Sequence, residues 1–269
     1  MNHALDGSPY RPLSAALSKR LLDVGKRVAA LRRRGVLTPQ ALRDYFDDSR
    51  FEQITQSNAI EGSTLSVGDT KLVVLYGGTV TGHDPAFILD ARSLARALDE
   101  VCEMANDPSP TDVQQVKRIH ELVLAHRPTV AGNLRTVEVA IRGARHRPPR
   151  TWGEVMTQME SWEAWSRAHA ASPAVLRSSV LHAWLEHVHP FVDGNGRTGR
   201  AVANLELIRA GCPPMIFRKK DRSRYLRCLA SADSGDLAPF VDLSLERTDA
   251  ALADFDKHAR RRKGAPRAR

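Results

Sequence analysis

Residues 187–200 read HVHPFVDGNGRTGR. This stretch places a histidine and an aspartate before a glycine-rich turn and two arginines after it. His189 can act as a base near neutral pH, and Asp193 offers the single carboxylate that Mg²⁺ commonly takes from a protein when phosphates supply its other ligands. The stretch therefore favours a site that grips a polyphosphate and attacks it.

The glycines of this loop favour an anion-binding backbone. Gly194, Asn195 and Gly196 tolerate positive φ, so successive N–H groups can turn inward and form a nest for an anion. A helix is expected to follow and to add its positive end, with Arg197 and Arg200 on one face of its first turn. A tight turn with surface arginines is the alternative, but such a turn needs neither the histidine nor the carboxylate.

The rest of the chain is mostly typical of helices. Apolar residues recur at helical spacing over residues 13–33, 86–104 and 174–188. Capping signals predict where further helices begin: Thr38 before Pro39, Ser66 with Asp69, Thr111 with Gln114, and Ser172 before Pro173. The last helices are expected over 152–170, 201–210, 222–233 and 237–257.

One segment departs from the helical pattern. Residues 136–141, TVEVAI, alternate β-branched and other side chains, which predicts a short strand or hairpin that ends at Pro148-Pro149. The fold class is therefore all-α with one small β element near residue 138. The tryptophans recur at helical positions and are expected in the core: Trp152, Trp162, Trp165 and Trp184.

Charge is concentrated at one end of the chain. The net charge is +9, and residues 257–269 contribute seven positive charges without an acid, so the remainder is close to neutral. We interpret this tail as a disordered basic segment, with contact to nucleic acid or an acidic partner as the alternative. No apolar run approaches a membrane span and no signal peptide is evident, so a cytoplasmic protein is expected. Its three scattered cysteines are expected to be reduced thiols.

The loop resembles the signature of the Fic family, H-P-F-x-[DE]-G-N-G-R-x-x-R. Each fixed position of that signature is matched between His189 and Arg200. The GNLR…PP segment and the RSRYLRCLASADSGD segment also fit, so the resemblance covers roughly residues 105–245. It implies an all-α, single Fic-type helical domain with a small β-hairpin flap.

The resemblance also implies an activity. Fic proteins mostly transfer AMP from ATP to a hydroxyl group of a target protein, with Mg²⁺ as cofactor. By position, His189 is similar to the general base, Asp193 to the Mg²⁺ ligand, and Arg200 to the residue that takes the γ-phosphate. The other loop positions are implied to bind the nucleotide's phosphates: Gly194, Asn195, Gly196, Arg197, Thr198 and Gly199.

Two further segments resemble nucleotide and target contacts of the family. The flap, about residues 136–142, is implied to clamp the target by strand pairing and to lie at the nucleotide with Val139, Ala140, Ile141 and Arg142. Residues at the positions of the family's adenine contacts are Tyr225, Leu226 and Asp233. Some members have asparagine where this chain has Asp233, which leaves the nucleotide preference open.

A second motif lies earlier in the chain, at residues 57–62, SNAIEG. Gly62 is typical of a residue that ends a helix, which places Glu61 at the negative end of the helix dipole, where an acid is disfavoured. A solvated surface glutamate is the alternative to a partner elsewhere. The motif resembles the family's inhibitory helix, [ST]-x-x-x-E-[GN], with Ser57, Glu61 and Gly62 at its fixed positions. The resemblance implies that Glu61 pairs with Arg200 and blocks ATP; in some members this glutamate also helps to remove AMP.

Three regions are expected: an N-terminal helical region, 1–104, with the inhibitory motif; a catalytic core, 105–245; and a helix end with the basic tail, 246–269. The expected partners are ATP and an unidentified target protein, with a homodimer left open and no membrane; nucleic acid is disfavoured. Transfer of another phosphate-linked group and a regulatory nucleotide-binding module are the alternatives. A zinc site at His182, His187 and His189 is disfavoured by their spacing.

Overall fold

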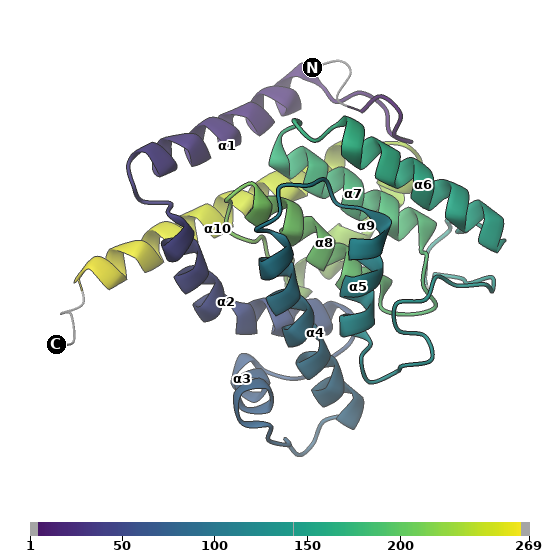
Figure 1. Cartoon of the computed structure of the whole chain (residues 1–269), viewed down its shortest axis with the longest axis horizontal. Coiled ribbons are helices and arrows are strands. Elements are labelled where there is room, and N and C mark those ends of the chain that lie inside the picture. Colours follow the sequence, from purple (N-terminus) through teal and green to yellow (C-terminus); the bar gives the residue numbers. More distant parts are fainter. Residues whose placement is uncertain (1–4, 142, 265–269) are drawn as a thin grey trace.

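The computed structural model describes residues 5–141 and 143–264. Within them the chain forms α-helices and one 3₁₀ helix, η1, and no strand (Figure 1). The elements are α1 (Ala15–Arg33), α2 (Pro39–Ile60), α3 (Val67–Tyr76), α4 (Pro85–Met104), α5 (Val113–Val123), α6 (Trp152–Ala168), α7 (Ala174–Val188), α8 (Asn195–Arg209), η1 (Lys219–Asp221), α9 (Arg222–Asp233) and α10 (Ala238–Gly264). The all-α fold predicted from the sequence is confirmed.

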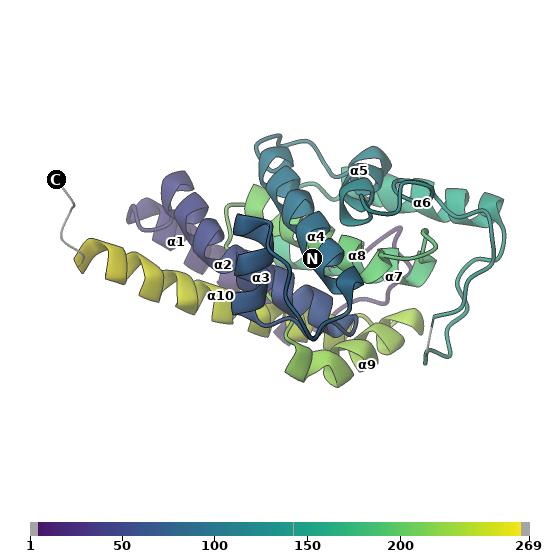
Figure 2. The same ribbon diagram turned by 90° about the horizontal axis from the view of Figure 1, so that it is seen from below.

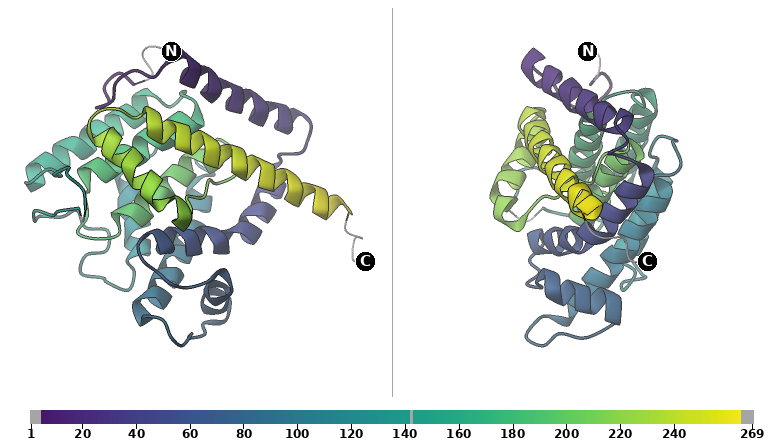
Figure 3. Two further views of the ribbon diagram at one scale, coloured as in Figure 1. Left: turned by 180° about the vertical axis from the view of Figure 1, so that it is seen from behind. Right: turned by 90° about the vertical axis from the view of Figure 1, so that its left-hand side faces the viewer.

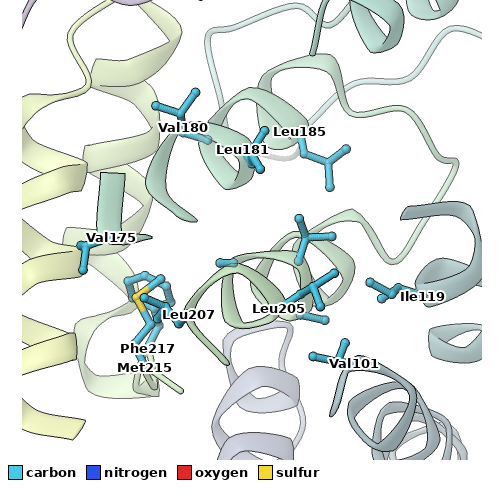
Figure 4. Packing of buried hydrophobic residues seen from close by; sticks show 14 of the residues in the cluster. Val101, Ile119, Val175, Val180, Leu181, Leu185, Leu205, Leu207, Met215 and Phe217 are labelled. Atoms are coloured by element: carbon cyan, nitrogen blue, oxygen red, sulfur yellow. The ribbon is translucent and has the colours of Figure 1, made fainter. Parts of the chain in front are cut away.

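Helices α7 and α8 form the centre of the molecule. α7 packs against α1, α6, α8, α9 and α10, while α8 also contacts α2, α4 and α5. Figure 4 shows Leu181 and Leu185 of α7 near Leu205 of α8, with Ile119 on the neighbouring α5. Helices that are buried on nearly all sides need no polar face, so these two carry the central core. The loop between them, residues 189–194, is therefore held at both ends by buried helices.

The outer helices complete the bundle around this pair. From behind, the long α10 crosses the molecule, with α1 along one side of it and α2 near its C-terminal half (Figure 3). No helix within the described ranges is long and apolar enough to cross a membrane. The three predicted regions, with boundaries at 104/105 and 245/246, stay predictions.

Several predicted helix starts are confirmed and three are wrong. Thr38 caps α2 ahead of Pro39, and Ser66 forms a capping box with Asp69. The cap of α5 is Asp112 rather than Thr111, whose hydroxyl donates to buried Glu206 instead. Helix α7 begins after Pro173 without a Ser172 cap, and α8 begins at Asn195 rather than at residue 201. Trp152, which was expected in the core, is 53% exposed.

The hairpin predicted near residue 138 is not found. Residues 136–141 and 143–150 form no strand. They contain one turn, in which the Ala144 N–H donates to the Ile141 carbonyl. Figure 2 shows this segment projecting from the helices beside α6. An isolated pair of short strands is at best marginally stable, and no third strand of the fold lies beside it to complete a ladder.

The basic tail is only partly as expected. Helix α10 continues to Gly264, so residues 257–264 are helical rather than disordered, and 265–269 lie outside the described residues. Arg260 pairs with Asp256 at 2.7 Å, and Arg262 pairs with Asp44 of α2 at 2.8 Å. Basic side chains at a helix C-terminus are favoured by the helix dipole, which explains why the positive charge prolongs the helix.

A buried ion pair joins α7 to α8. Arg177 Nε lies 2.6 Å from Glu206 Oε2, with only 6% and 3% of the side chains exposed. Glu206 also pairs with Arg209 at 3.1 Å, and Arg177 Nη1 donates to the Ser166 carbonyl at 2.8 Å. Breaking one partner of such a pair leaves an uncompensated charge in the core.

Replacing Arg177 therefore tests this packing. We expect Arg177→Met to lower the free energy of unfolding by about 3 kcal/mol, because Glu206 loses a buried partner. Urea unfolding measures the change. The matched control is Arg167→Met, since the Arg167 side chain is 65% exposed where it pairs with Glu163; its loss should stay below about 1 kcal/mol. Equal losses for the two variants would contradict a structural role for the buried pair.

Candidate functional site

His189 ends α7 in a constrained backbone conformation. Its φ and ψ are 49° and 59°, and it is the one non-glycine residue with positive φ in the described part of the chain. The buried guanidinium of Arg135 donates to the carbonyl oxygens of His189 at 2.7 Å, Val188 at 3.3 Å and Pro149 at 2.6 Å. Arg135 thus holds the end of α7, and with it the backbone that carries the imidazole.

The loop after His189 is closed by its own asparagine. The Asn195 side chain accepts a hydrogen bond from Phe191 N–H at 3.0 Å and donates to the Phe191 carbonyl at 2.9 Å. Gly194 has φ 75°, in the left-handed region that glycine adopts without strain, and α8 begins directly after it. The N-terminus of α8 therefore faces the loop, as an anion site at a helix end requires.

His120 of α5 supports the loop from the other side. Its ring stacks on Phe191, with centroids 3.6 Å apart, and its Nε2 lies 2.9 Å from the Asp193 carbonyl oxygen. The N–H of Gly132 donates to His120 Nδ1 at 2.9 Å, so Nε2 carries the proton and donates to Asp193. Burial lowers the pKa of His120 to about 4, which keeps this ring neutral.

Asp193 and Arg197 belong to a group of four charges. Arg127 pairs with Asp193, while Arg197 pairs with Asp90 of α4 and lies 3.6 Å from Asp193 Oδ1. The Arg197 side chain is 6% exposed, whereas Asp193 is 46% exposed. The arginine is therefore fixed in the protein, and the carboxylate is accessible to a cation from solvent.

Arg200 is buried and meets the motif of residues 57–62. Its Nη2 lies 2.7 Å from Glu61 Oε1 and 2.9 Å from the Ser57 carbonyl, and its Nε donates to Ser57 Oγ at 2.9 Å. Its Nη1 lies 3.4 Å from Tyr225 Oη. The predicted contact between Glu61 and Arg200 is present, although 139 positions separate the two residues. Gly62, with φ 111°, follows the end of α2.

The C-terminal end of α2 is held by η1 and by the first residue of α9. The Lys219 N–H donates to Gln56 Oε1 at 2.9 Å, and Arg222 Nε donates to the Ile60 carbonyl at 2.8 Å. The second bond satisfies one of the carbonyl groups that a helix end leaves without a partner. Glu61 therefore extends from a helix end whose position is fixed by the protein.

The other predicted binding residues are spread over three elements. Thr198 and Gly199 lie buried within α8. On the flap, Val139 and Ile141 are half-buried and Ala140 is exposed, while Arg142 lies outside the described residues.

The predicted adenine contacts lie on α9. Tyr225 is buried and bonds His182 Nε2 at 2.8 Å, whereas Leu226 is 39% exposed. Asp233 Oδ1 lies 3.0 Å from His187 Nδ1. The structure thus brings Tyr225 to Arg200 and leaves Leu226 at the surface.

One group of side chains in the described residues could hold a metal ion through histidine. The ligand atoms of His146, His187 and Asp233 lie within 4.8 Å of one another. His146 and His187 stack with centroids 4.0 Å apart, and His146 Nε2 donates to the His187 carbonyl at 2.8 Å. With the bond between His187 and Asp233, these groups satisfy one another, so the cluster is explained without an ion.

Sequence reasoning missed a buried carboxyl group next to His189. Glu186 lies on α7, one turn before it, with Oε2 4.0 Å from His189 Nδ1. Burial raises the pKa of Glu186 to about 8 and lowers that of His189 to about 4. No signal in the sequence distinguishes Glu186 from a surface glutamate, because the burial comes from the packing of α8.

The sequence is similar to that of a known protein family. The profile of the Fic/DOC family matches residues 110–207. Proteins named "Protein adenylyltransferase Fic" from Drosophila sechellia and Drosophila melanogaster are 32% identical over 219 residues, which is 79% of this chain and 43% of theirs. The chain thus spans less than half of the length of these curated relatives.

Solved structures agree with the fold. Fic-1 (residues 134–508) from C. elegans superposes with a TM-score of 0.75 at 26% identity, over 90% of this chain and 71% of that one. A Fic family protein from Desulfovibrio desulfuricans G20 superposes with a TM-score of 0.71 at 28% identity, over 93% and 76%. The helical arrangement of this chain therefore also occurs in both of these Fic proteins.

The buried ionisable groups predict how stability changes with pH. The pKa values of His120 and His189 fall to about 4 and that of His182 to about 3, all chiefly through burial. Below about pH 6.5 the unfolded chain binds protons at these histidines that the native chain does not, so stability falls as pH drops. Glu186 has the opposite effect, because its pKa is raised: between about pH 4.5 and 8 the native chain binds one proton there that the unfolded chain does not.

We therefore expect the free energy of unfolding to fall by about 2–3 kcal/mol for each unit by which the pH is lowered near pH 5.5. This slope corresponds to a net of about two protons that the unfolded chain binds and the native chain does not. Urea unfolding between pH 5 and 7 measures the slope. In His182→Gln the slope should be shallower, because the unfolded chain binds about one proton fewer. The amide of glutamine can still bond Tyr225 but cannot titrate. A slope that is unchanged in this variant would show that His182 is not held neutral.

Proposed function

This chain carries a domain of the Fic/DOC family at residues 110–207, and on that premise we propose that it is a protein adenylyltransferase. It would transfer AMP from ATP to a serine, threonine or tyrosine hydroxyl of a target protein, and to itself where a hydroxyl can reach. The observation that carries the proposal is the grouping of His189, Asp193, Arg197 and Arg200 at the junction of α7 and α8. The names of the curated relatives support the choice of reaction.

His189 is the proposed general base. It takes the proton of the target hydroxyl while that oxygen attacks the α-phosphorus of ATP and pyrophosphate departs. The lowered pKa of about 4, which is due mainly to burial, supports this role because the ring is unprotonated at neutral pH. A positioned base contributes about 10²–10⁴ in rate.

The phosphates are assigned to the start of α8. The backbone N–H groups of residues 194–196 and the positive end of the helix would bind phosphate oxygens. Arg197, buried and held by Asp90, would stabilise the charge that develops on pyrophosphate, and Arg200 would take the γ-phosphate. Fixed charges of this kind supply most of the catalysis in phosphoryl-centre reactions.

Asp193 is the proposed ligand of a divalent cation, for which we favour Mg²⁺. Its half-exposed carboxylate fits, since Mg²⁺ is often bound through one carboxylate and the substrate's phosphates. The present partner Arg127 is itself 45% exposed, so it can exchange the carboxylate for phosphate. When bound, Mg²⁺ would neutralise phosphate charge.

Glu61 is the proposed inhibitor of this reaction. It pairs with Arg200, so the γ-phosphate cannot take that guanidinium without displacing the carboxylate. Glu61 also lies over Gly196, close enough that a Cβ at that position would meet its carboxylate. The same glutamate is a candidate for helping the reverse reaction, removal of AMP from the target.

The contacts to the target segment and to the adenine ring are proposed in less detail. Residues 136–141, which form neither helix nor strand in this structure, would pair with the target segment as an added strand. Leu226 and Asp233 would meet the adenine, while the buried Tyr225 would act indirectly through Arg200. An ionised Asp233 only accepts hydrogen bonds, which suits the amino group of adenine.

The proposal is tested with α-labelled ATP and Mg²⁺ on three purified forms: wild type, Glu61→Gly, and Glu61→Gly with His189→Ala. We expect weak labelling of protein in wild type and at least about tenfold more in Glu61→Gly. Arg200 is then free to take the γ-phosphate, and a hydrogen bond between charged groups contributes about 1.5–3 kcal/mol. The double variant should give none. Cell lysate supplies candidate targets, and the chain itself serves as one.

If Glu61→Gly binds ATP but labels no protein in lysate, the regulatory nucleotide-binding module becomes the better explanation. Label that appears only from γ-labelled ATP would indicate transfer of another phosphate-linked group. Retention on DNA that disappears on truncation after Asp256 would support the nucleic-acid alternative for the tail. Whether the chain forms a homodimer stays open, and a cytoplasmic location stays a prediction.

A further inference from the structure

Glu186 is a buried carboxyl group that the proposed reaction does not yet use. Its Oε1 has no hydrogen-bond partner within the described residues, and its Oε2 lies 4.0 Å from His189 Nδ1, which also lacks one. Only 13% of the Glu186 side chain is exposed. Burying a carboxyl group without a partner costs stability, so this position is not explained by the fold.

The space for this carboxyl group comes from Gly199. A Cβ at Gly199 would lie 2.8 Å from Glu186 Oε1 and 2.5 Å from His182 Nδ1, so a larger residue in α8 would displace both side chains. His182 Nδ1 is likewise buried without a partner. The absence of a side chain at Gly199 thus lets two buried polar groups, Glu186 Oε1 and His182 Nδ1, lie against α8.

Charged groups from several neighbouring elements act on Glu186 and His189. Arg200 of α8 lowers the pKa of Glu186, while Glu61 of α2 and Asp233 of α9 raise it, and burial outweighs them all. The groups that act on His189 are the backbone of Glu186, Arg135, Glu61 and His146, which lies after the flap. His182 and Tyr225 lie beside Glu186. Near pH 7 the two side chains, Glu186 and His189, are therefore both uncharged.

We propose that Glu186 is a positioning residue for His189, whose carboxylate faces the Nδ1–H of the ring and compensates the positive charge that the ring acquires as base. The inference rests on the proposed function. In the balanced step, the target oxygen forms its bond to the α-phosphorus as its proton passes to His189 Nε2. The bond from the α-phosphorus to pyrophosphate breaks, and the Nδ1 proton stays on the ring.

The rate of AMP transfer should depend on the protonation of Glu186. A neutral carboxyl group compensates the imidazolium poorly, whereas the carboxylate compensates it well, because opposite charges at this distance in a buried site attract strongly. Transfer should therefore become faster as Glu186 loses its proton, around pH 8 in the native chain. Because Glu61 raises the pKa of Glu186, the rise should occur at lower pH in Glu61→Gly.

The test uses the full chain carrying Glu61→Gly, alone and with Glu186→Gln. The rate of AMP transfer is measured from pH 6 to 9, and the ring nitrogens of His189 are followed by ¹⁵N NMR in the same range. We expect Glu186→Gln to lower kcat at least about tenfold at pH 8, with KM for ATP unchanged, and to abolish the rise with pH. The His189 nitrogens should report a titration near pH 8 or below that Glu186→Gln removes.

Two further variants control for structure. Glu160→Gln, on the exposed face of α6, should leave kcat and the pH profile unchanged. Glu186→Met keeps the volume of the side chain but not its polarity; if it melts like Glu186→Gln yet is equally slow, a packing defect is excluded. Identical pH profiles and identical His189 titrations with and without Glu186→Gln would overturn the inference. The NMR arm decides it even if Glu61→Gly transfers no AMP, in which case the proposed function fails separately.

Discussion

The hydrogen bonds of Arg135 to the end of α7 are the constraint on which the site depends. A non-glycine residue in left-handed conformation is strained, and His189 adopts it only because the surroundings hold it there. Arg135 supplies four donations to backbone carbonyls, including the two that end α7 and one from Pro149 beyond the flap. The same side chain therefore sets the direction of the loop and anchors the flap. Burial lowers the pKa of this guanidinium, and the carbonyl oxygens around it oppose that effect because they accept hydrogen bonds from its charged form.

Charge pairing governs the rest of the site. Arg197 and Arg200 are both almost fully buried on α8, and each has a carboxylate from another helix, Asp90 for Arg197 and Glu61 for Arg200. Burial lowers the pKa of Arg200, but Glu61 and Tyr225 raise it by more, so the guanidinium remains charged. The two carboxylates differ in exposure, 20% for Asp90 and 44% for Glu61. The first pair is thus a fixed part of the site, and the second can be opened from solvent.

Local signals in the sequence predicted the fold class and much of the site. The spacing of apolar residues gave the helices, and the dense motif from His189 to Arg200 identified the loop, because several chemically distinct groups adjoin there. Glu61 could be paired with Arg200 only through the resemblance, since no local rule joins residues so distant in the chain. His120, Asp90 and Glu186 were missed because their roles arise from packing between helices. The prediction of a hairpin was wrong because alternation of side chains leads to a strand only where a neighbouring strand is available to pair with it.

Because Glu61 and Arg200 belong to the same chain, a ligand of Arg200 must compete with a carboxylate that is always nearby. Diluting the protein does not separate the two groups, because the local concentration of the carboxylate is fixed by α2 and by the bonds that hold its C-terminal end. A ligand that needs a free guanidinium binds only the open fraction of molecules, and an open fraction of about 1% weakens its apparent affinity about 100-fold. Any partner that pulls on α2 or on the segment that contacts it would change that fraction. The affinity of the site for its nucleotide would then be set from outside the site, without a change in any residue that touches the nucleotide.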